Sequence, residues 1–246
     1  MIPKKIHFCW LSGKEYPDDI KKCMQTWKDK LPDYEFVLWD INKFDINSVE
    51  FVKEAVSVKK WAFASDYIRL YAVYTEGGIY MDTDIIVKKN FDKFLEHSFF
   101  TAVEYNAPSK ANFTAEGSKD EKSKYLIQAA LFGASAGHPY IRDCMDWYND
   151  KHFILPDGSF FNSFIAPYIY ALIAEKHGFM PKDELQKLDN GMVIYPSIVF
   201  TNDRYKYTEE TYAVHWWKGS WRDKNLFKKA LSFASRQVFL SRTFGK

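Results

Sequence analysis

The sequence predicts an α/β protein, because segments typical of buried strands alternate with segments typical of helices along the chain. The composition supports a folded domain, since 47% of the 246 residues are hydrophobic and 27% are charged. The net charge of +2 comes from 34 basic and 32 acidic residues, a balance that argues against nucleic-acid binding by phosphate neutralisation. We therefore expect one sizeable α/β domain.

The N-terminal part reads as strand, helix, strand and then a longer helix. An apolar, alternating segment at 4–10 predicts a buried strand, 16–34 contains a helix flanked by two prolines, and 34–40 predicts a second strand. Residues 61–76 contain no Gly or Pro and have apolar side chains at helical spacing. This pattern predicts a helix that ends at Gly77-Gly78, followed by short strands on both sides of 82–84.

The second half of the chain predicts further strands and two helices. We expect strands within 99–104, 126–135, 193–200 and 212–216, and helices near 139–150 and 160–177. Residues 106–124 are polar and rich in small side chains, which indicates a mobile loop within the domain.

The C-terminal tail, residues 222–246, has a strongly basic composition. It carries seven basic residues and one acid, and from Leu226 onwards apolar and basic side chains fall on different sides of a helix. Such a basic amphipathic helix either docks on its own domain or lies on an anionic membrane.

Two features of the sequence bear on where the protein works. The three cysteines, Cys9, Cys23 and Cys144, are scattered and lack metal-site spacing, which favours free thiols in a reducing compartment. The N-terminus lacks the apolar core of a signal peptide, and no apolar run reaches the roughly 18 residues that a membrane span needs. We expect a cytoplasmic protein whose membrane contact would be peripheral, on the inner face of the cell membrane.

The residues that indicate chemistry lie in SDYIRLYAVYTEGGIYMDTD, residues 65–84. Asp82 and Asp84 stand one residue apart between apolar segments, where unpaired negative charge is costly. A divalent cation would relieve their repulsion, because Mg²⁺ and Mn²⁺ prefer hard oxygen ligands and commonly bind carboxylates together with substrate phosphates. The alternative is a solvated turn with two surface acids, and the spacing alone does not exclude it. Asp66 and Arg69 stand three residues apart on the preceding helix, hence on one face.

Three motifs, in order along the chain, resemble those of a known family. Residues 62–84 follow the pattern A-x-x-S-D-x-x-R-x-x-x-L-x-x-x-G-G-x-Y-x-D-x-D, with Val73 where leucine is usual. The segments IPKKIHFCW at 2–10 and VHWWKGSW at 214–221 supply the other two motifs. Together they are similar to the signature of glycosyltransferase family 32, which includes yeast initiating α-mannosyltransferases and is related to the glucosyltransferase domains of large clostridial toxins.

The resemblance implies a GT-A fold, a Rossmann-like mixed sheet flanked by helices, over residues 1–221. The nucleotide-sugar half would lie at about 1–105 and the acceptor half at about 125–221, where the small residues of 129–139 would lie beside the acceptor. The implied reaction is the transfer of a hexose, with retention, from a nucleotide sugar to a glycan acceptor. A UDP-hexose is the first expected donor and GDP-mannose its competitor; the acceptor would be a capsular or cell-surface polysaccharide or a lipid-linked oligosaccharide.

The positions of the motifs also imply roles for individual residues. Asp82, Asp84 and His215 would hold Mn²⁺ or Mg²⁺. Asp66 and Arg69, with the two metal-binding aspartates, would form the catalytic set and bind sugar hydroxyls and the diphosphate. The expected substrate-binding residues are Trp10, which would lie against the nucleobase, Ser65, Tyr80, Ser220 and Trp221.

Two other functions fit parts of the pattern. A Mg²⁺-dependent phosphohydrolase could also use Asp82 and Asp84, although no further carboxylate-rich motif accompanies the pair. A non-catalytic glycan-binding protein could keep the same scaffold, although every metal-proximal position of the motif is filled here. Turnover of nucleotide sugars in the presence of Mn²⁺ would distinguish the transferase from both.

Overall fold

The computed structural model describes residues 1–105, 124–161, 164–201 and 207–216, which fall in one unit, Met1–Trp216. The strands are β1 (Lys5–Cys9), β2 (Glu35–Trp39), β3 (Gly78–Met81), β4 (Ile85–Val87), β5 (Phe99–Tyr105), β6 (Tyr125–Ile127), β7 (Leu131–Ala134), β8 (Gln186–Lys187), β9 (Met192–Tyr195), β10 (Phe200–Thr201) and β11 (Ala213–His215). The α-helices are α1 (Asp18–Lys30), α2 (Glu50–Ser57), α3 (Trp61–Glu76), α4 (Pro139–Asp146) and α5 (Ala166–Ala174), with short 3₁₀ turns at Ile46–Ser48, Asp92–Phe94, Glu175–His177 and Asp189–Gly191.

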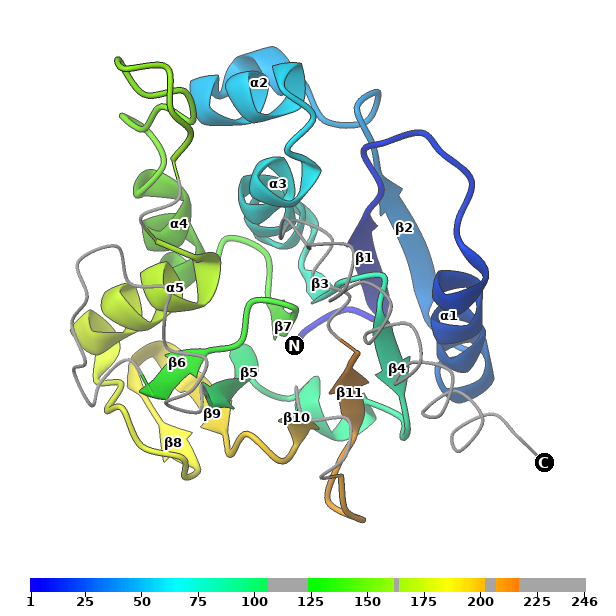
Figure 1. Cartoon of the computed structure of the whole chain (residues 1–246). Helices are drawn as coiled ribbons and strands as arrows, with labels where there is room; N and C mark the ends of the chain where they lie inside the picture. The colour runs from blue at the N-terminus through cyan, green and yellow to red at the C-terminus, as the bar shows by residue number, and fades with distance from the viewer. Residues whose placement is uncertain (106–123, 162–163, 202–206, 217–246) are drawn as a thin grey trace, which may run out of the picture. The chain divides into compact units, whose positions relative to one another are not determined.

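Among the described residues, eight strands form a central mixed sheet and three form a smaller sheet (Figure 1). The order in the central sheet is β2-β1-β3-β7-β5-β9-β8, with β6 beside β5, and the order in the smaller sheet is β10-β11-β4. Strand β1 is parallel to β2 and β3, whereas β7 is antiparallel to both β3 and β5. The carboxyl ends of β1, β2, β3 and β5 therefore meet at one end of the sheet, here called the carboxyl edge, where α/β sheets commonly bind ligands.

Each face of the central sheet packs against its own layer. Side chains alternate between faces along a strand, so Tyr80 joins the core beneath α2, α3, α4 and α5, while Ile79 and Met81 join the core shared with α1 and the smaller sheet. The result is a three-layer arrangement in which the helices that cover one face and the smaller sheet on the other both border the carboxyl edge.

The turn from α3 into β3 depends on glycine. Gly77 has φ 63°, and a Cβ atom there would lie 2.9 Å from the backbone nitrogen of Ala136. Only glycine adopts this conformation without strain in so little space. The helix can therefore stop and reverse directly into the sheet, which leaves the first turns of α3 at the carboxyl edge.

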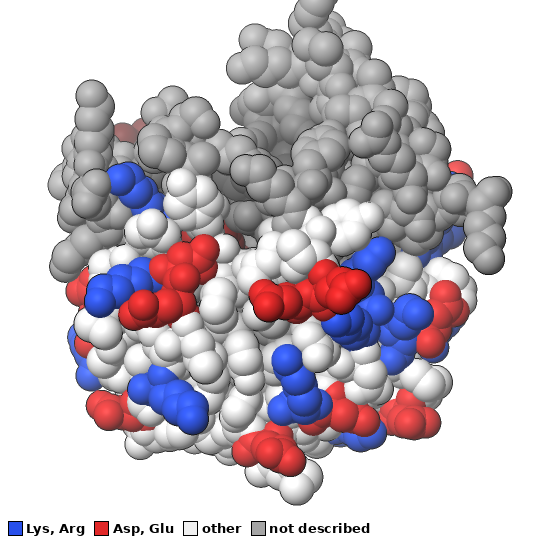
Figure 2. Space-filling model, turned by 90° about the horizontal axis from the view of Figure 1, so that it is seen from below, with Lys and Arg blue, Asp and Glu red and all other residues white. Residues whose placement is uncertain are grey.

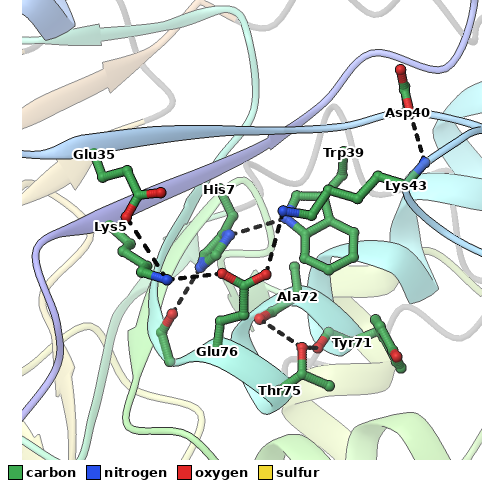
Figure 3. A network of polar contacts seen from close by, with 11 residues as sticks. Lys5, His7, Glu35, Trp39, Asp40, Lys43, Tyr71, Ala72, Thr75 and Glu76 are labelled. Atoms are coloured by element: carbon green, nitrogen blue, oxygen red, sulfur yellow. Dashed lines mark hydrogen bonds and ion pairs between the residues drawn. The ribbon is translucent and has the colours of Figure 1, made fainter.

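A polar network fixes this end of α3 against β1 (Figure 3). The Glu76 carboxylate pairs with Lys5 at 3.0 Å and with Lys43 at 3.3 Å. The buried ring of His7 accepts a hydrogen bond from Trp39 Nε1 at its Nδ1 (3.0 Å), so its Nε2–H can donate to the Gly77 carbonyl at 2.7 Å. Burial lowers the pKa of His7, which suits this neutral form.

Two predicted elements differ from the structure in ways that matter for the site. The strand expected within 126–135 is divided into β6 and β7, because the register shifts by three residues between the Val103–Ile127 and Phe100–Gly133 pairs. The extra residues form a bulge whose carbonyl groups point to the carboxyl edge.

The helix expected near 160–177 begins only at Ala166, because the chain before it turns back on itself and pairs Ile154 with Phe160. Helix α2 is an element that the sequence patterns did not predict. The loop at 106–123 and the basic helix at 222–246 lie outside the described residues.

The near-equal numbers of basic and acidic residues in the sequence are reflected in how these side chains are distributed on the surface. On the face shown in Figure 2, the described Lys and Arg side chains are interspersed with Asp and Glu side chains. In the part of the chain that the structure describes, no helix combines the length and hydrophobicity needed to cross a bilayer.

Candidate functional site

Asp82 and Asp84 lie in the turn that leads from the central sheet to the smaller sheet. Strand β3 ends at Met81 and β4 begins at Ile85, so both aspartates leave the sheet at the carboxyl edge. The Asp82 N–H donates to the Ala130 carbonyl at 2.8 Å, and the Tyr80 hydroxyl donates to Asp82 Oδ1 at 2.7 Å. Backbone and side chain of Asp82 are therefore both held in place.

His215 reaches the same turn from the end of β11. This strand is antiparallel to β4, with His215 opposite Ile85, and the Trp216 N–H donates to the Asp84 carbonyl at 3.0 Å. His215 Nε2 lies 3.3 Å from Asp84 Oδ1. One ligand atom each from Asp82, Asp84 and His215 can be chosen so that all three lie within 4.8 Å of one another. The three residues expected to bind metal thus converge.

This set of donors suits a divalent ion of the Mn²⁺ or Mg²⁺ type. Two carboxylates and an imidazole provide hard and borderline ligands, and the side chains of Asp82 and Asp84 keep 27% and 16% of their surface exposed. Burial disfavours the charged form of His215, but the nearby carboxylates, chiefly that of Asp84, together outweigh this effect and raise the pKa of His215 to about 9. The imidazolium therefore neutralises Asp84 as it stands and must lose its proton before it can act as a ligand.

Arg69, on the third turn of α3, links the groups of the site. Its buried guanidinium lies 3.0 Å from Asp66 Oδ1 and 3.5 Å from Asp82 Oδ1. It also donates to the Ala129 carbonyl at 2.9 Å and to the Ser65 carbonyl and hydroxyl at 3.1 Å each, and it lies over the Tyr80 ring at 4.8 Å. Nearly all of its hydrogen-bonding capacity is used within the protein, so Arg69 orients the two carboxylates.

Asp66 is the carboxylate on the helix side of the site. Its side chain is 17% exposed, and Arg69 is its ion-pair partner. Burial raises the pKa of Asp66 to about 7, in spite of the opposing charge of Arg69 and with a contribution from Asp82. Its backbone carbonyl accepts a hydrogen bond from the Tyr170 hydroxyl of α5 at 3.2 Å.

Ser65 and Tyr80, expected to bind substrate, are both buried. The Ser65 hydroxyl donates to the Ala62 carbonyl and accepts from Arg69, and the Tyr80 hydroxyl is used by Asp82. Both side chains act on the site through Arg69 and Asp82 in this arrangement, and their direct contact with substrate remains a prediction.

Trp10 follows β1 at the carboxyl edge. Its ring is half-buried and 4.8 Å from the Tyr16 ring, and its Nε1–H donates to the Lys14 carbonyl at 2.5 Å. These two contacts fix the orientation of the indole at this edge. Ser220 and Trp221, the remaining expected substrate-binding residues, lie outside the described residues.

Several contributions to the site were not predicted from the sequence. They are the backbone carbonyls of Ala129 and Ala130, the hydroxyl of Tyr170, and the charge of Glu104, which adds to the rise in the pKa of His215. The small-residue segment at 129–139 was the available signal for the two carbonyls, whereas no sequence pattern indicated Tyr170 or Glu104.

Comparison with known proteins identifies sequences similar to the region that contains Asp82 and Asp84. Residues 17–101 match the sequence model described as a glycosyltransferase sugar-binding region containing a DXD motif. Over these residues the chain is similar to the DXD sugar-binding region of glycosyltransferases. The match agrees, over this region, with the resemblance to family 32 described from the sequence.

Relatives of the DXD region occur in viruses and fungi. An uncharacterized glycosyltransferase of Acanthamoeba polyphaga mimivirus is 28% identical over 145 residues, which is 56% of this chain and 52% of that protein. The initiation-specific α-1,6-mannosyltransferase of Candida albicans is 29% identical over 107 residues, 39% of this chain and 28% of the relative. The chain thus matches about half the length of the viral relative and less of the fungal one.

The fold around the DXD region also has a solved counterpart. The PaToxG glycosyltransferase shares it with a TM-score of 0.50 at 18% sequence identity, over 71% of this chain and 69% of that one. The α/β GT-A fold predicted from the sequence is confirmed.

Proposed function

We propose that the protein is a metal-dependent, retaining glycosyltransferase that moves a hexose from a nucleotide sugar to a glycan acceptor. The observation that carries this proposal is the convergence of Asp82, Asp84 and His215 at the carboxyl edge, with Arg69 joining Asp82 to Asp66. Three carboxylates and one guanidinium leave two net negative charges when His215 is neutral and Asp66 is ionised, so a bound cation would offset the repulsion between the site and a diphosphate. Glycosyltransferases of the DXD type generally depend on such a metal.

The protein's own residues would divide the work between orientation and charge. When bound, Mn²⁺ or Mg²⁺ supplies positive charge for the diphosphate that departs from the sugar. Asp82, Asp84 and His215 hold that charge in place, and Tyr80 fixes the carboxylate of Asp82. Asp66 offers acceptor oxygens to sugar hydroxyls, and the partners of Arg69 keep this carboxylate aimed at the site before substrate arrives.

The donor in this proposal is a UDP-hexose, with GDP-mannose as the competitor. Retention and the UDP donor rest on the resemblance to family 32. The fungal relatives are named as mannosyltransferases, which keeps mannose among the sugars to be tested.

The acceptor and location are proposed on similar grounds. We place the protein in the cytoplasm, where it would extend a capsular or cell-surface glycan or a lipid-linked oligosaccharide, with its basic tail on the inner face of the membrane. A pull-down with vesicles containing anionic lipid tests the tail, since removal of residues 222–246 should abolish vesicle binding and leave nucleotide-sugar binding unchanged.

A thermal-shift panel tests the proposed function. UDP-glucose, UDP-galactose and GDP-mannose are each tested with and without Mn²⁺, and one of them should stabilise the protein in a Mn²⁺-dependent way, by ~2.7 kcal/mol at 100 times its dissociation constant. Asp84→Asn should remove this effect, whereas Asp189→Asn, at an exposed aspartate outside the site, should keep it. Stabilisation that is equal in Asp84→Asn and wild type would contradict the assignment.

The same site leaves a phosphohydrolase as the second function to be tested. Release of inorganic phosphate from simple phosphate esters, without turnover of nucleotide sugars, would support that alternative. The absence of both activities, with glycan binding retained, would support a non-catalytic glycan-binding protein.

A further inference from the structure

An open pair of tyrosines lies at the carboxyl edge, where β5 ends and β6 begins. Tyr105 and Tyr125 are directly opposite each other in the antiparallel ladder, so their side chains project from the same face of the sheet. Their ring centroids are 5.6 Å apart and their ring planes are inclined at 41°. Tyr105 is 42% exposed and Tyr125 is half-buried, so the pair presents an aromatic surface to solvent.

These tyrosines lie on the face of the sheet that α3 covers. Val103 and Ile127, which are paired two residues further into the same two strands, belong to the core beneath the helices. Residues two apart on a strand share a face, so Tyr105 and Tyr125 project on that side as well. Helix α3 packs on the same core and carries Asp66 on its second turn. Asp66 and the two tyrosines therefore border the carboxyl edge on the same side of the sheet, with β5 two strands away from β3.

The hydroxyl groups of this pair are not used by the fold. The buried tyrosines Tyr80, Tyr140 and Tyr170 each donate their hydroxyl hydrogen to an acceptor within the protein. Among the described residues, by contrast, none is hydrogen-bonded to the hydroxyl of Tyr105 or Tyr125. A tyrosine hydroxyl can both donate and accept, so the pair offers a ligand polar groups at its rim as well as ring faces.

The charges around the pair favour an uncharged ligand that carries hydroxyl groups. Glu104 precedes Tyr105 on β5 and projects from the other face, where its charge contributes to the raised pKa of His215. Asp66, on the same side as the tyrosines, keeps 17% of its side chain exposed. Carboxylates repel a bound anion, whereas they accept hydrogen bonds from the hydroxyl groups of a sugar.

We propose that Tyr105 and Tyr125 form an acceptor platform, on which a pyranose ring of the glycan acceptor stacks. A pyranose has a face of C–H groups and a rim of hydroxyl groups, so it can pack on the tyrosine rings while its rim bonds to their hydroxyls. Two rings inclined at 41° fit a puckered sugar ring better than a flat base. Trp10, the expected contact of the base, follows β1 on the opposite side of β3. This inference rests on the proposed function, of which it specifies where the acceptor binds.

The experiment follows release of the nucleoside diphosphate by the full chain in the presence of Mn²⁺, as the concentration of an added sugar is raised. UDP-glucose, UDP-galactose and GDP-mannose are the donors, and the added sugars are the methyl glycosides of glucose, galactose and mannose together with lactose and maltose. At least one sugar should stimulate release in wild type with a saturable dependence. Tyr105→Ala should raise the KM for that sugar about tenfold, whereas the KM for the donor should change by less than about twofold.

Two further variants separate stacking from other effects. Tyr105→Phe keeps the ring and removes only the hydroxyl, so it should raise the KM for the sugar by less than about threefold. Tyr207→Ala is the matched control, because Tyr207 is 40% exposed but lies away from the carboxyl edge. Its ring contacts the ammonium of Lys88, which follows β4 at the end remote from Asp84. The KM for the sugar in Tyr207→Ala should equal that of wild type.

The outcomes distinguish the acceptor platform from the proposed transferase. A KM for the sugar that is the same in Tyr105→Ala and in wild type, or that rises equally in Tyr207→Ala, overturns the platform and leaves the transferase standing. Mn²⁺-dependent donor turnover that none of the added sugars stimulates has the same meaning. The absence of turnover of every donor overturns the proposed transferase and the platform together.

Discussion

Proton release on metal binding is the prediction that the geometry of the site makes most directly. His215 is an imidazolium paired with Asp84 at 3.3 Å, and it can ligate a metal only after it loses a proton. Protons therefore compete with the metal, and the affinity for Mn²⁺ should rise with pH until His215 is neutral.

The magnitude follows from the pKa of His215, which Asp84 raises to about 9. Between about pH 6.5 and 8.5 the affinity should rise nearly tenfold per pH unit, and it should level off above pH 9. At pH 8, one unit below this pKa, about 0.9 of the His215 side chains are protonated. Asp66, whose pKa is about 7, is then about 0.1 protonated and contributes little.

Calorimetric titration with Mn²⁺ at pH 8, in two buffers of different ionisation enthalpy, counts the protons released. We expect about 0.9 proton per bound ion in wild type and about 0.1 or fewer in His215→Asn, which keeps an oxygen ligand but cannot titrate. If wild type binds Mn²⁺ without releasing a proton, His215 is not a ligand and the reasoning from its pairing with Asp84 fails.

Three further predictions concern the groups that position the site. Arg69→Met should reduce the free energy of unfolding by about 3–5 kcal/mol in urea titrations, because it removes the buried guanidinium that pairs with two partly buried carboxylates. A loss under 1 kcal/mol would show that these ion pairs contribute little to stability. Tyr80→Phe removes a hydrogen bond to the Asp82 carboxylate, so it should lower the free energy of unfolding by about 1.5–3 kcal/mol and weaken Mn²⁺ binding. An unchanged Mn²⁺ affinity would refute the role of Tyr80 in positioning Asp82. Gly77→Ala should lower the free energy of unfolding by about 1–3 kcal/mol in the same titrations. The control is Gly13→Ala, which has a similar φ but nothing within 4 Å of the new Cβ, and it should lower the free energy of unfolding by less. Equal losses in the two variants would mean that the crowding at Gly77 is unimportant.

Local sequence patterns predicted the parts of the fold that depend on near neighbours. Helix α3 has the predicted bounds, because sixteen residues without Gly or Pro are followed by Gly77, whose φ of 63° ends the helix. The strands on both sides of 82–84 were predicted for the same reason, since apolar runs flank the aspartates.

The parts that depend on distant contacts could not be predicted from local patterns. The orientation of Arg69 needs the carbonyl of Ala129, which a three-residue register shift in the middle of a predicted strand brings into place. The pairing of His215 with Asp84 needs β11 beside β4, and only the order of the family motifs suggested it. Periodicity reports which residues are buried, but it does not report which distant strand they will pair with.

Turnover of a nucleotide sugar tests the central claim most directly. The protein is incubated with UDP-glucose, UDP-galactose or GDP-mannose and Mn²⁺, and release of the nucleoside diphosphate is followed with and without oligosaccharide acceptors. We predict Mn²⁺-dependent release from at least one donor, which is lost in Asp84→Asn and retained in Asp189→Asn. Release that continues at the wild-type rate in Asp84→Asn, or the absence of release from every donor, would contradict the claim that Asp82, Asp84 and His215 form the centre of a glycosyltransferase.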